Sequence, residues 1–307
     1  MKGVSEMNIV EKSVLSTDNK HQLCGKVYLP DGEAKGYFHV VHGMTEHIGR
    51  YDRFMREMSE AGYICFGYDH LGHGATASED ELGFIASKDG WKYLCRDVHQ
   101  FASSVMSEYG EAPYYLMGHS MGSFIVRLAV TMDSKPDKLV IMGTGGENPA
   151  ADIGLGIIGL ISKLFGEKHI SKLVDSIAFG SYNKRFKGED EKAWLTGDML
   201  VREKYLADPW CNYKFTVSAM SDLVTLNKNS NLGETFQKTP VDMPIFVISG
   251  SEDPVGDYGE GVAKVFEGYN AAGCKAEMKL YEGYRHEILN DKSYEKVLVD
   301  IIKFVSK

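Results

Sequence analysis

The chain has 307 residues, of which 43% are hydrophobic and 25% charged, and a formal net charge of −9. This length is enough to bury a large core, and the acidic balance argues against a nucleic-acid-binding protein, which is usually basic. The five cysteines are odd in number, scattered and without a CxxC pair, which predicts reduced thiols rather than a disulfide framework.

No segment of the sequence predicts export or membrane insertion. Residues 1–6 lack the apolar core of a signal peptide. The most apolar stretch, 153–161, is too short to span a bilayer and is followed by Lys163. We therefore expect a soluble, cytoplasmic protein.

Short apolar runs alternate with amphipathic segments along most of the chain. This alternation is typical of βα units, and it predicts an α/β fold with a mostly parallel central sheet flanked by helices. In chain order the predicted elements are strands 25–29 and 37–41, helix 51–62, strand 64–68, helix 90–108, strand 114–117, helix 121–133, strands 138–142 and 245–249, helix 257–272, strand 276–281 and helix 292–305.

The alternation stops between about residues 146 and 235. This region is richer in charge, contains no convincing strand and has helix-like pieces at 153–166 and 190–206. We predict that 146–235 is a helical cap over the carboxyl edge of the sheet, inserted into a core domain made of 1–145 and 236–307.

The pentapeptide Gly118-His119-Ser120-Met121-Gly122 lies between a predicted strand and a predicted helix. A serine between two glycines on such a turn is the nucleophile elbow of an α/β-hydrolase. The turn strains the serine backbone, and only small residues fit two positions to either side. Ser120 is therefore the candidate nucleophile, the alternative being an ordinary turn serine.

A nucleophilic serine needs a base, and the base needs an orienting acid, in the chain order Ser, acid, His. Asp253 directly follows a predicted strand, where the acid belongs, and competes with Glu252 and Asp257. His286 follows the last predicted strand and is the last histidine of the chain, so it has no rival in the required position. We predict a triad of Ser120, Asp253 and His286.

Acyl transfer also needs hydrogen-bond donors for the oxyanion. One donor is expected to be the backbone N–H of Met121, and the second should come from the loop after strand 37–41. Within that loop Met44 is the better candidate, ahead of Gly43 and Thr45.

Four histidines in two short loops raise the question of a metal site. They are His42, His47, His70 and His73. Neither a Glu-x-x-His helix nor a thiolate pair accompanies them, so we expect histidines that brace the loops and no metal.

These motifs together resemble those of the monoacylglycerol lipase and lysophospholipase branch of the α/β-hydrolase superfamily, which is also grouped with serine aminopeptidase-like hydrolases. The matching pieces, in the family's order, are His42–His47 with Arg50-Tyr51, Asp69–Gly74, Gly118–Gly122, Gly250–Pro254 and His286–Leu289. The resemblance implies the same triad, oxyanion amides at Met44 and Met121, and a helical cap. It also implies that Glu46 and Arg50 line the pocket for the polar leaving group, although both residues could instead brace their own loop.

We interpret the sequence as a serine carboxylic-ester hydrolase that acts on monoacylglycerols or lysophospholipids through an acyl-enzyme and needs no cofactor. The alternatives are a small-ester carboxylesterase, an aminopeptidase that binds the substrate amine with cap carboxylates, and an inactive hydrolase-like binding protein. The candidate cap carboxylates are Glu189, Asp190, Glu191 and Asp198. The apolar stretch 153–161 either packs within the cap or makes transient contact with a membrane or micelle. The oligomeric state is left open.

Overall fold

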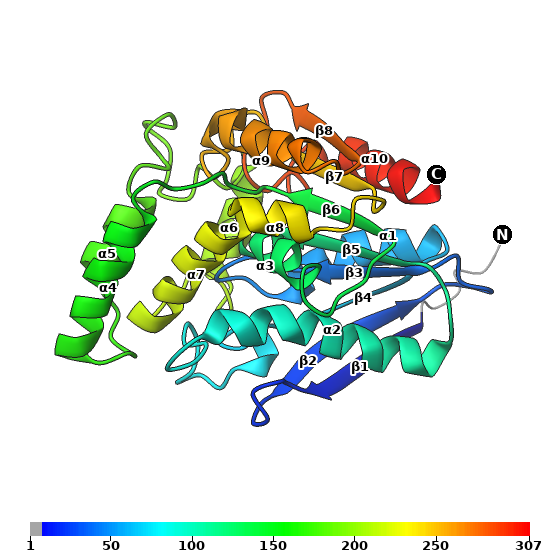
Figure 1. The fold of residues 1–307 in the computed structure, drawn as a ribbon, viewed down its shortest axis with the longest axis horizontal. Coiled ribbons are helices and arrows are strands. Elements are labelled where there is room, and N and C mark those ends of the chain that lie inside the picture. The colour runs from blue at the N-terminus through cyan, green and yellow to red at the C-terminus, as the bar shows by residue number, and fades with distance from the viewer. Residues whose placement is uncertain (1–7) are drawn as a thin grey trace.

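The computed structural model describes residues 8–307, so residues 1–6, considered above for a signal peptide, lie outside it. One sheet of eight strands runs through the molecule in the order β1-β2-β4-β3-β5-β6-β7-β8 (Figure 1). The strands are β1 Asn8–Leu15, β2 Gln22–Leu29, β3 Tyr37–Val41, β4 Ile64–Tyr68, β5 Tyr114–His119, β6 Lys138–Met142, β7 Ile245–Gly250 and β8 Ala276–Tyr281. β1 pairs with β2, and β2 with β4, in the antiparallel direction, whereas the other neighbouring strands pair in parallel, as predicted.

Both faces of the sheet are covered by helices, which explains why the central strands are almost uniformly apolar. The helices outside the insertion are α1 Asp52–Glu60, α2 Gly90–Tyr109, α3 Met121–Ala129, α9 Glu260–Ala271 and α10 Tyr294–Ser306. Along β3, Tyr37 and Val41 face the core formed with α2, α3 and α9, whereas Phe38 and Val40 face the core formed with α1 and α10.

Between β6 and β7 the chain forms five helices and no strand, which agrees with the predicted helical character of this region. These helices are α4 Ala151–Phe165, α5 Lys172–Phe179, α6 Met199–Ala207, α7 Val217–Ser230 and α8 Gly233–Lys238. α7 packs against α3 and α2, while α4 and α5 form the end of the molecule opposite the C-terminus (Figure 1). Among residues 8–307, no helix combines the length and the apolar character needed to cross a membrane.

Two sequence predictions differ from the structure. The helix predicted over 190–206 forms only at α6, because residues 190–198 make turns held by Asp190 and Asp198, whose carboxylates accept hydrogen bonds from nearby backbone N–H groups. The sequence analysis also missed β1, an edge strand whose side chains are largely exposed or half-buried and so lack an apolar run.

Candidate active site

Ser120 lies at the turn between β5 and α3, and its backbone adopts the strained conformation expected of a nucleophile elbow. Its φ and ψ are 54° and −121°. A Cβ at Gly118 would come within 2.2 Å of the carbonyl oxygen of Gly122, and a Cβ at Gly122 within 2.1 Å of that of Val41. Both glycines are therefore required by close backbone approach, and the elbow sits at the carboxyl edge of the sheet.

Asp253 and His286 come together from the loops after β7 and β8. His286 Nδ1 lies 2.8 Å from Asp253 Oδ2, and Asp253 is fully buried. The Ser249 hydroxyl donates to the same carboxylate oxygen at 2.9 Å, and the Val255 N–H donates to the other at 2.9 Å, so the acid is held from both sides. The alternative acid Glu252 lies 3.6 Å from Arg185 in a partly exposed ion pair.

The environment of His286 favours its protonated form. Burial by itself lowers the pKa of the imidazole, but the charge of Asp253, its hydrogen bond and the nearby Glu287 and Glu46 outweigh that effect, so the pKa is raised above its usual value. The ring of His119 packs beside His286 at a centroid distance of 4.7 Å. His286 also lines the same cavity as Ser120.

The two amides predicted to hold the oxyanion are not used in hydrogen bonds between the described residues. Within residues 8–307, neither the N–H of Met44 nor that of Met121 donates a hydrogen bond to the protein. Gly43 brings its loop against Ser120, because a Cβ at this position would lie 3.0 Å from the Ser120 Cβ and 2.7 Å from Glu46 Oε1.

Glu46 and Arg50 are placed differently with respect to the site. Glu46 lines the cavity that contains Ser120, and its carboxylate accepts hydrogen bonds from the Gly43 N–H at 2.6 Å and the Tyr51 hydroxyl at 2.9 Å. Arg50 does not line that cavity, since its guanidinium is bound by Glu46 and Glu287.

Two cavities of different character meet at Ser120. The first, called here the polar cavity, has a volume of about 390 Å³, and the second, the apolar cavity, about 430 Å³. Met44, Ser120, Phe179 and Trp194 line both. Charged and polar residues of the polar cavity include Glu46, Asp175, Glu191, Lys192, Tyr205, Asn212, Lys214, His286 and Glu287; the apolar cavity is walled largely by Met121, Phe124, Ile153, Ile157, Ile158, Val174, Ile177, Met220, Leu223 and Val224.

Comparison with known proteins identifies the family. The model of the family described as serine aminopeptidase, S33, matches residues 32–293. The chain belongs to this family. It is a serine hydrolase with the α/β-hydrolase fold, similar to the monoacylglycerol lipases.

Individual relatives of this hydrolase agree with that assignment. A monoglyceride lipase homolog of monkeypox virus is 27% identical over 94% of both chains, and the monoacylglycerol lipase of Mycolicibacterium smegmatis is 23% identical over 95% of this chain and 98% of its own. The structure of a thermostable carboxyl esterase from Bacillus coagulans in complex with glycerol superposes with a TM-score of 0.92, at 29% identity and 98% coverage of both chains.

The segment between β6 and β7 contributes residues to the hydrolase site that the sequence analysis did not identify. The Trp194 ring packs on the His286 ring at 5.2 Å, and the N–H of Glu287 donates to the Leu195 carbonyl at 2.7 Å. The Tyr205 hydroxyl donates to the carbonyl of Thr45 at 3.1 Å. These contacts join positions remote in sequence, so no local pattern marks them.

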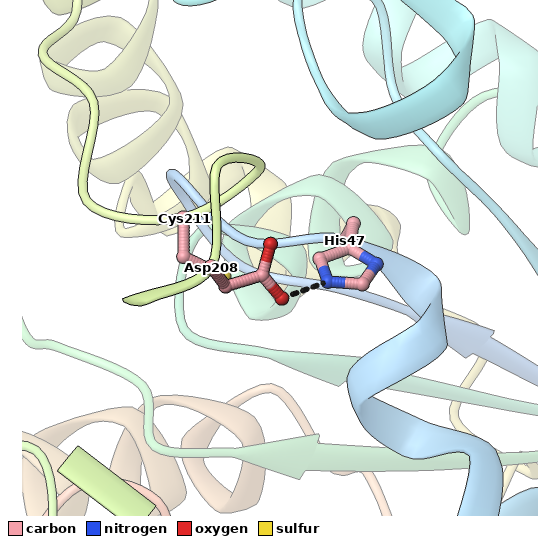
Figure 2. A group of neighbouring side chains, drawn as sticks. All are labelled: His47, Asp208 and Cys211. Carbon is pink, nitrogen blue, oxygen red and sulfur yellow. Dashed lines mark hydrogen bonds and ion pairs between the residues drawn. The ribbon is translucent and has the colours of Figure 1, made fainter. Parts of the chain in front are cut away.

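A second contact ties this segment to the loop after β3. Figure 2 shows His47 facing Asp208, with His47 Nε2 2.9 Å from Asp208 Oδ2 and Cys211 beside them. Potential ligand atoms of these three residues lie within 4.8 Å of one another, the only such group found in the described part of the chain. Burial raises the pKa of the Cys211 thiol, and the hydrogen bond between His47 and Asp208 links the segment to the loop after β3.

The other histidines considered as metal ligands are buried among themselves. The ring centroids of His42 and His70 lie 4.1 Å apart with the planes tilted by 45°, and burial lowers the pKa of His42 to about 3 and that of His73 to about 4. The expectation that no metal binds stays a prediction.

Proposed function

We propose that this hydrolase cleaves the ester of monoacyl lipids through Ser120, His286 and Asp253. The observation that carries the proposal is the meeting of a polar and an apolar cavity at Ser120. An ester carbonyl placed there would have its acyl chain in the apolar cavity and its alcohol in the polar cavity.

In the first step His286 removes the proton of Ser120 while the hydroxyl attacks the ester carbonyl. Asp253 fixes the imidazole tautomer through Nδ1 and stabilises the imidazolium that forms. The Met44 and Met121 amides hold the negative oxygen. His286 then donates its proton to the leaving alcohol, which leaves an acyl group on Ser120.

In the second step a water molecule replaces the alcohol in the polar cavity. His286 takes a proton from this water as it attacks the acyl-enzyme, and returns a proton to Ser120 when the fatty acid is released. No cofactor takes part in either step.

The apolar cavity favours a monoacyl lipid over a small ester. Its volume of about 430 Å³ falls within the range of small-molecule sites, and its walls are mainly aliphatic and aromatic. The relatives named as monoglyceride or monoacylglycerol lipases support the same substrate class.

An aminopeptidase needs free carboxylates for the substrate amine, and most of the candidates in the cap are engaged. Glu189 binds Arg202 at 2.6 Å and Arg285 at 2.7 Å, and Asp190 lies 3.1 Å from Arg202. Asp198 caps α6. Glu191 does line the polar cavity, so peptide substrates belong in the test below.

The helical segment would also bring the enzyme to its lipid substrate. We infer that residues 146–235 act as a cap whose outer apolar side chains contact a membrane or micelle transiently. In support, Leu160 and Leu164 of α4 are 60% and 67% exposed, Leu173 of α5 is 58% exposed, and none of the three lines either cavity.

A substrate panel with one active-site variant tests the proposal. The panel contains monoacylglycerols, lysophospholipids, p-nitrophenyl esters of several chain lengths and aminoacyl anilides. We expect turnover of long-chain monoacyl lipids and a loss of about 10³-fold or more in Ser120→Ala, with the fold unchanged by circular dichroism. Turnover of the anilides alone would favour the aminopeptidase, and a folded protein that takes no fluorophosphonate label would favour a binding protein.

A further inference from the structure

A buried ion-pair network joins the two loops that carry the proposed catalytic groups. The Arg50 Nη1 donates to Glu46 at 2.6 Å and to Glu287 at 2.7 Å, and Nη2 donates to the other oxygen of Glu287 at 2.7 Å. The side chains of Arg50, Glu46 and Glu287 are 10%, 3% and 4% exposed. A bidentate contact of this kind fixes the relative orientation of its partners.

Each carboxylate lies next to a group that takes part in the proposed chemistry. Glu46 accepts the N–H of Gly43, the residue before the Met44 amide, and Glu287 follows His286 in the chain. Arg50 therefore connects the loop of the oxyanion amide with the loop of the catalytic base.

We propose that Arg50 is a positioning residue that holds the Met44 amide and the His286 imidazole in their working geometry and balances the two carboxylates near that imidazole. This proposal rests on the proposed function. It replaces the expectation that Arg50 binds the leaving group, because its guanidinium does not line the polar cavity and its donors are directed to carboxylates.

The charges around His286 make the second part of the proposal testable. The imidazole faces Asp253 from the loop after β7, Glu46 from the loop after β3, and Glu287 from its own loop. His119 packs beside it, while Trp194, its neighbour from the cap, is uncharged. Arg50 is the cation bound to two of these carboxylates, so its removal leaves more uncompensated negative charge near the base.

The proposed cap also contacts Arg50. The guanidinium of Arg50 lies 4.9 Å from the centre of the Tyr205 ring of α6, and the Tyr205 hydroxyl bonds to Thr45. A change at Arg50 would thus reach the cap as well, and the experiment needs readouts that distinguish positioning from general stability.

Arg50→Lys tests the geometry while keeping the charge. An ammonium cannot make the bidentate contact, so we expect kcat to fall by about 10-fold or more while KM changes by less than about threefold. The acid limb of kcat/KM should stay at the same pH as in the wild type, because the positive charge is still present. A raised KM with unchanged kcat would instead place Arg50 in substrate binding and overturn the proposal.

Arg50→Gln and Glu287→Gln test the charge in opposite directions. Arg50→Gln leaves Glu46 and Glu287 uncompensated, so the acid limb of kcat/KM should move to higher pH by about half a unit or more. Glu287→Gln removes a negative charge beside His286, so the limb should move to lower pH. If Arg50 and Glu287 had only a structural role, both variants would lower the melting temperature, but the acid limbs of their kcat/KM profiles would not move in opposite directions.

The matched control is Arg56→Gln, which removes the ion pair that Arg56 makes with Asp52 at 2.7 Å on the surface of α1. It should leave kcat, KM and the acid limb unchanged. Unaltered kinetics in both Arg50 variants would overturn the proposal; if Arg50→Gln fails to fold, Arg50→Lys and Glu287→Gln decide it. Fluorophosphonate labelling of the wild-type protein distinguishes failure of the Arg50 proposal from failure of the proposed function. A folded wild-type protein that takes no label would contradict the proposed function itself.

Discussion

At the scale of single residues, the candidate site is shaped by a strained turn at Ser120 and by contacts between loops that are far apart in the sequence. The strained turn at Ser120 follows from two glycines four positions apart, whose missing side chains allow backbone atoms to approach. The pairing of Asp253 with His286 follows from two loops at the same sheet edge. The contacts of Arg50 with Glu287 and of Trp194 with His286 have no local signature, so only the structure shows them.

Gly43 offers a test of the proposed oxyanion loop. In Gly43→Ala the new methyl group would lie 2.7 Å from Glu46 Oε1 and 3.0 Å from the Ser120 Cβ, so the loop must shift. We expect kcat on a p-nitrophenyl ester to fall by about 10-fold or more, with native circular dichroism. Gly159→Ala is the control, because nothing lies within 4 Å of its Cβ position and it lines neither cavity. Equal kcat in wild type and Gly43→Ala would argue against this loop as an oxyanion donor.

The raised pKa of His286 predicts a pH dependence. The protonated imidazole cannot accept the Ser120 proton, so kcat/KM should fall as the pH drops through the pKa of the free enzyme. Because Asp253, Glu287 and Glu46 raise this pKa despite burial, the midpoint should lie above pH ~6.5. Initial rates with a soluble ester between pH 4 and 9 would measure it, and a profile flat down to pH ~4 would exclude His286 as the base.

At the scale of elements, the core helices and strands were predicted because their apolar runs are continuous and both sheet faces are covered. Between β6 and β7 the sequence predicts a helix at 153–166, which corresponds to α4, but it does not predict α5, α7 and α8 individually, because these helices pack through long-range contacts. α7, for example, packs on α2 and α3 rather than forming an isolated part of the insertion. The proposed boundaries of the cap at 146 and 235 stay a prediction.

One such contact joins α7 to the start of α2. The Trp91 N–H in the first turn of α2 donates to Asp222 Oδ1 at 3.0 Å, whereas the helix's own N-cap residue, Asp89, makes no capping bond with its side chain. Asp222 Oδ2 is buried without a hydrogen-bond partner, and burial raises the pKa of Asp222 to about 7. The ionised carboxylate is therefore costly in the folded state.

Asp222→Asn should change how stability depends on pH. A folded-state pKa raised above the unfolded value means that the contribution of Asp222 is fully present below pH ~4 and is lost as the pH rises towards ~7. The free energy of unfolding of the wild type relative to Asp222→Asn should thus fall over this range, by up to roughly 4 kcal/mol. Urea unfolding at pH 4, 5.5 and 7 would measure it, with the surface variant Glu234→Gln as a control. A constant difference across this range would contradict the prediction.

At the scale of the whole molecule, α4 and α5 lie at one end and α10 near the other (Figure 1). α4 and α5 carry several exposed apolar side chains. The sequence shows that residues 153–161 are apolar, but not whether they pack inside the protein or face solvent, because that depends on how α4 packs on α7. The structure leaves Leu160 and Leu164 exposed and away from both cavities.

The double variant Leu160→Gln, Leu164→Gln tests lipid docking. Loss of this apolar area should lower kcat/KM on micellar long-chain monoacylglycerol by about fivefold or more, while hydrolysis of a soluble short-chain ester stays unchanged. Val299→Gln, at an exposed valine of α10, should alter neither rate. An equal loss on both substrates would indicate damage to the site rather than to docking.

The meeting of two cavities at one serine also bears on what the acyl-enzyme reacts with. In the proposed mechanism the alcohol leaves the polar cavity while the fatty chain stays in the apolar cavity, so any small hydroxyl compound that enters the polar cavity should compete with water for the acyl group. Added methanol or glycerol should therefore convert part of the product from free fatty acid to a new ester. The ratio of ester to fatty acid would measure how selectively the polar cavity admits water over other nucleophiles.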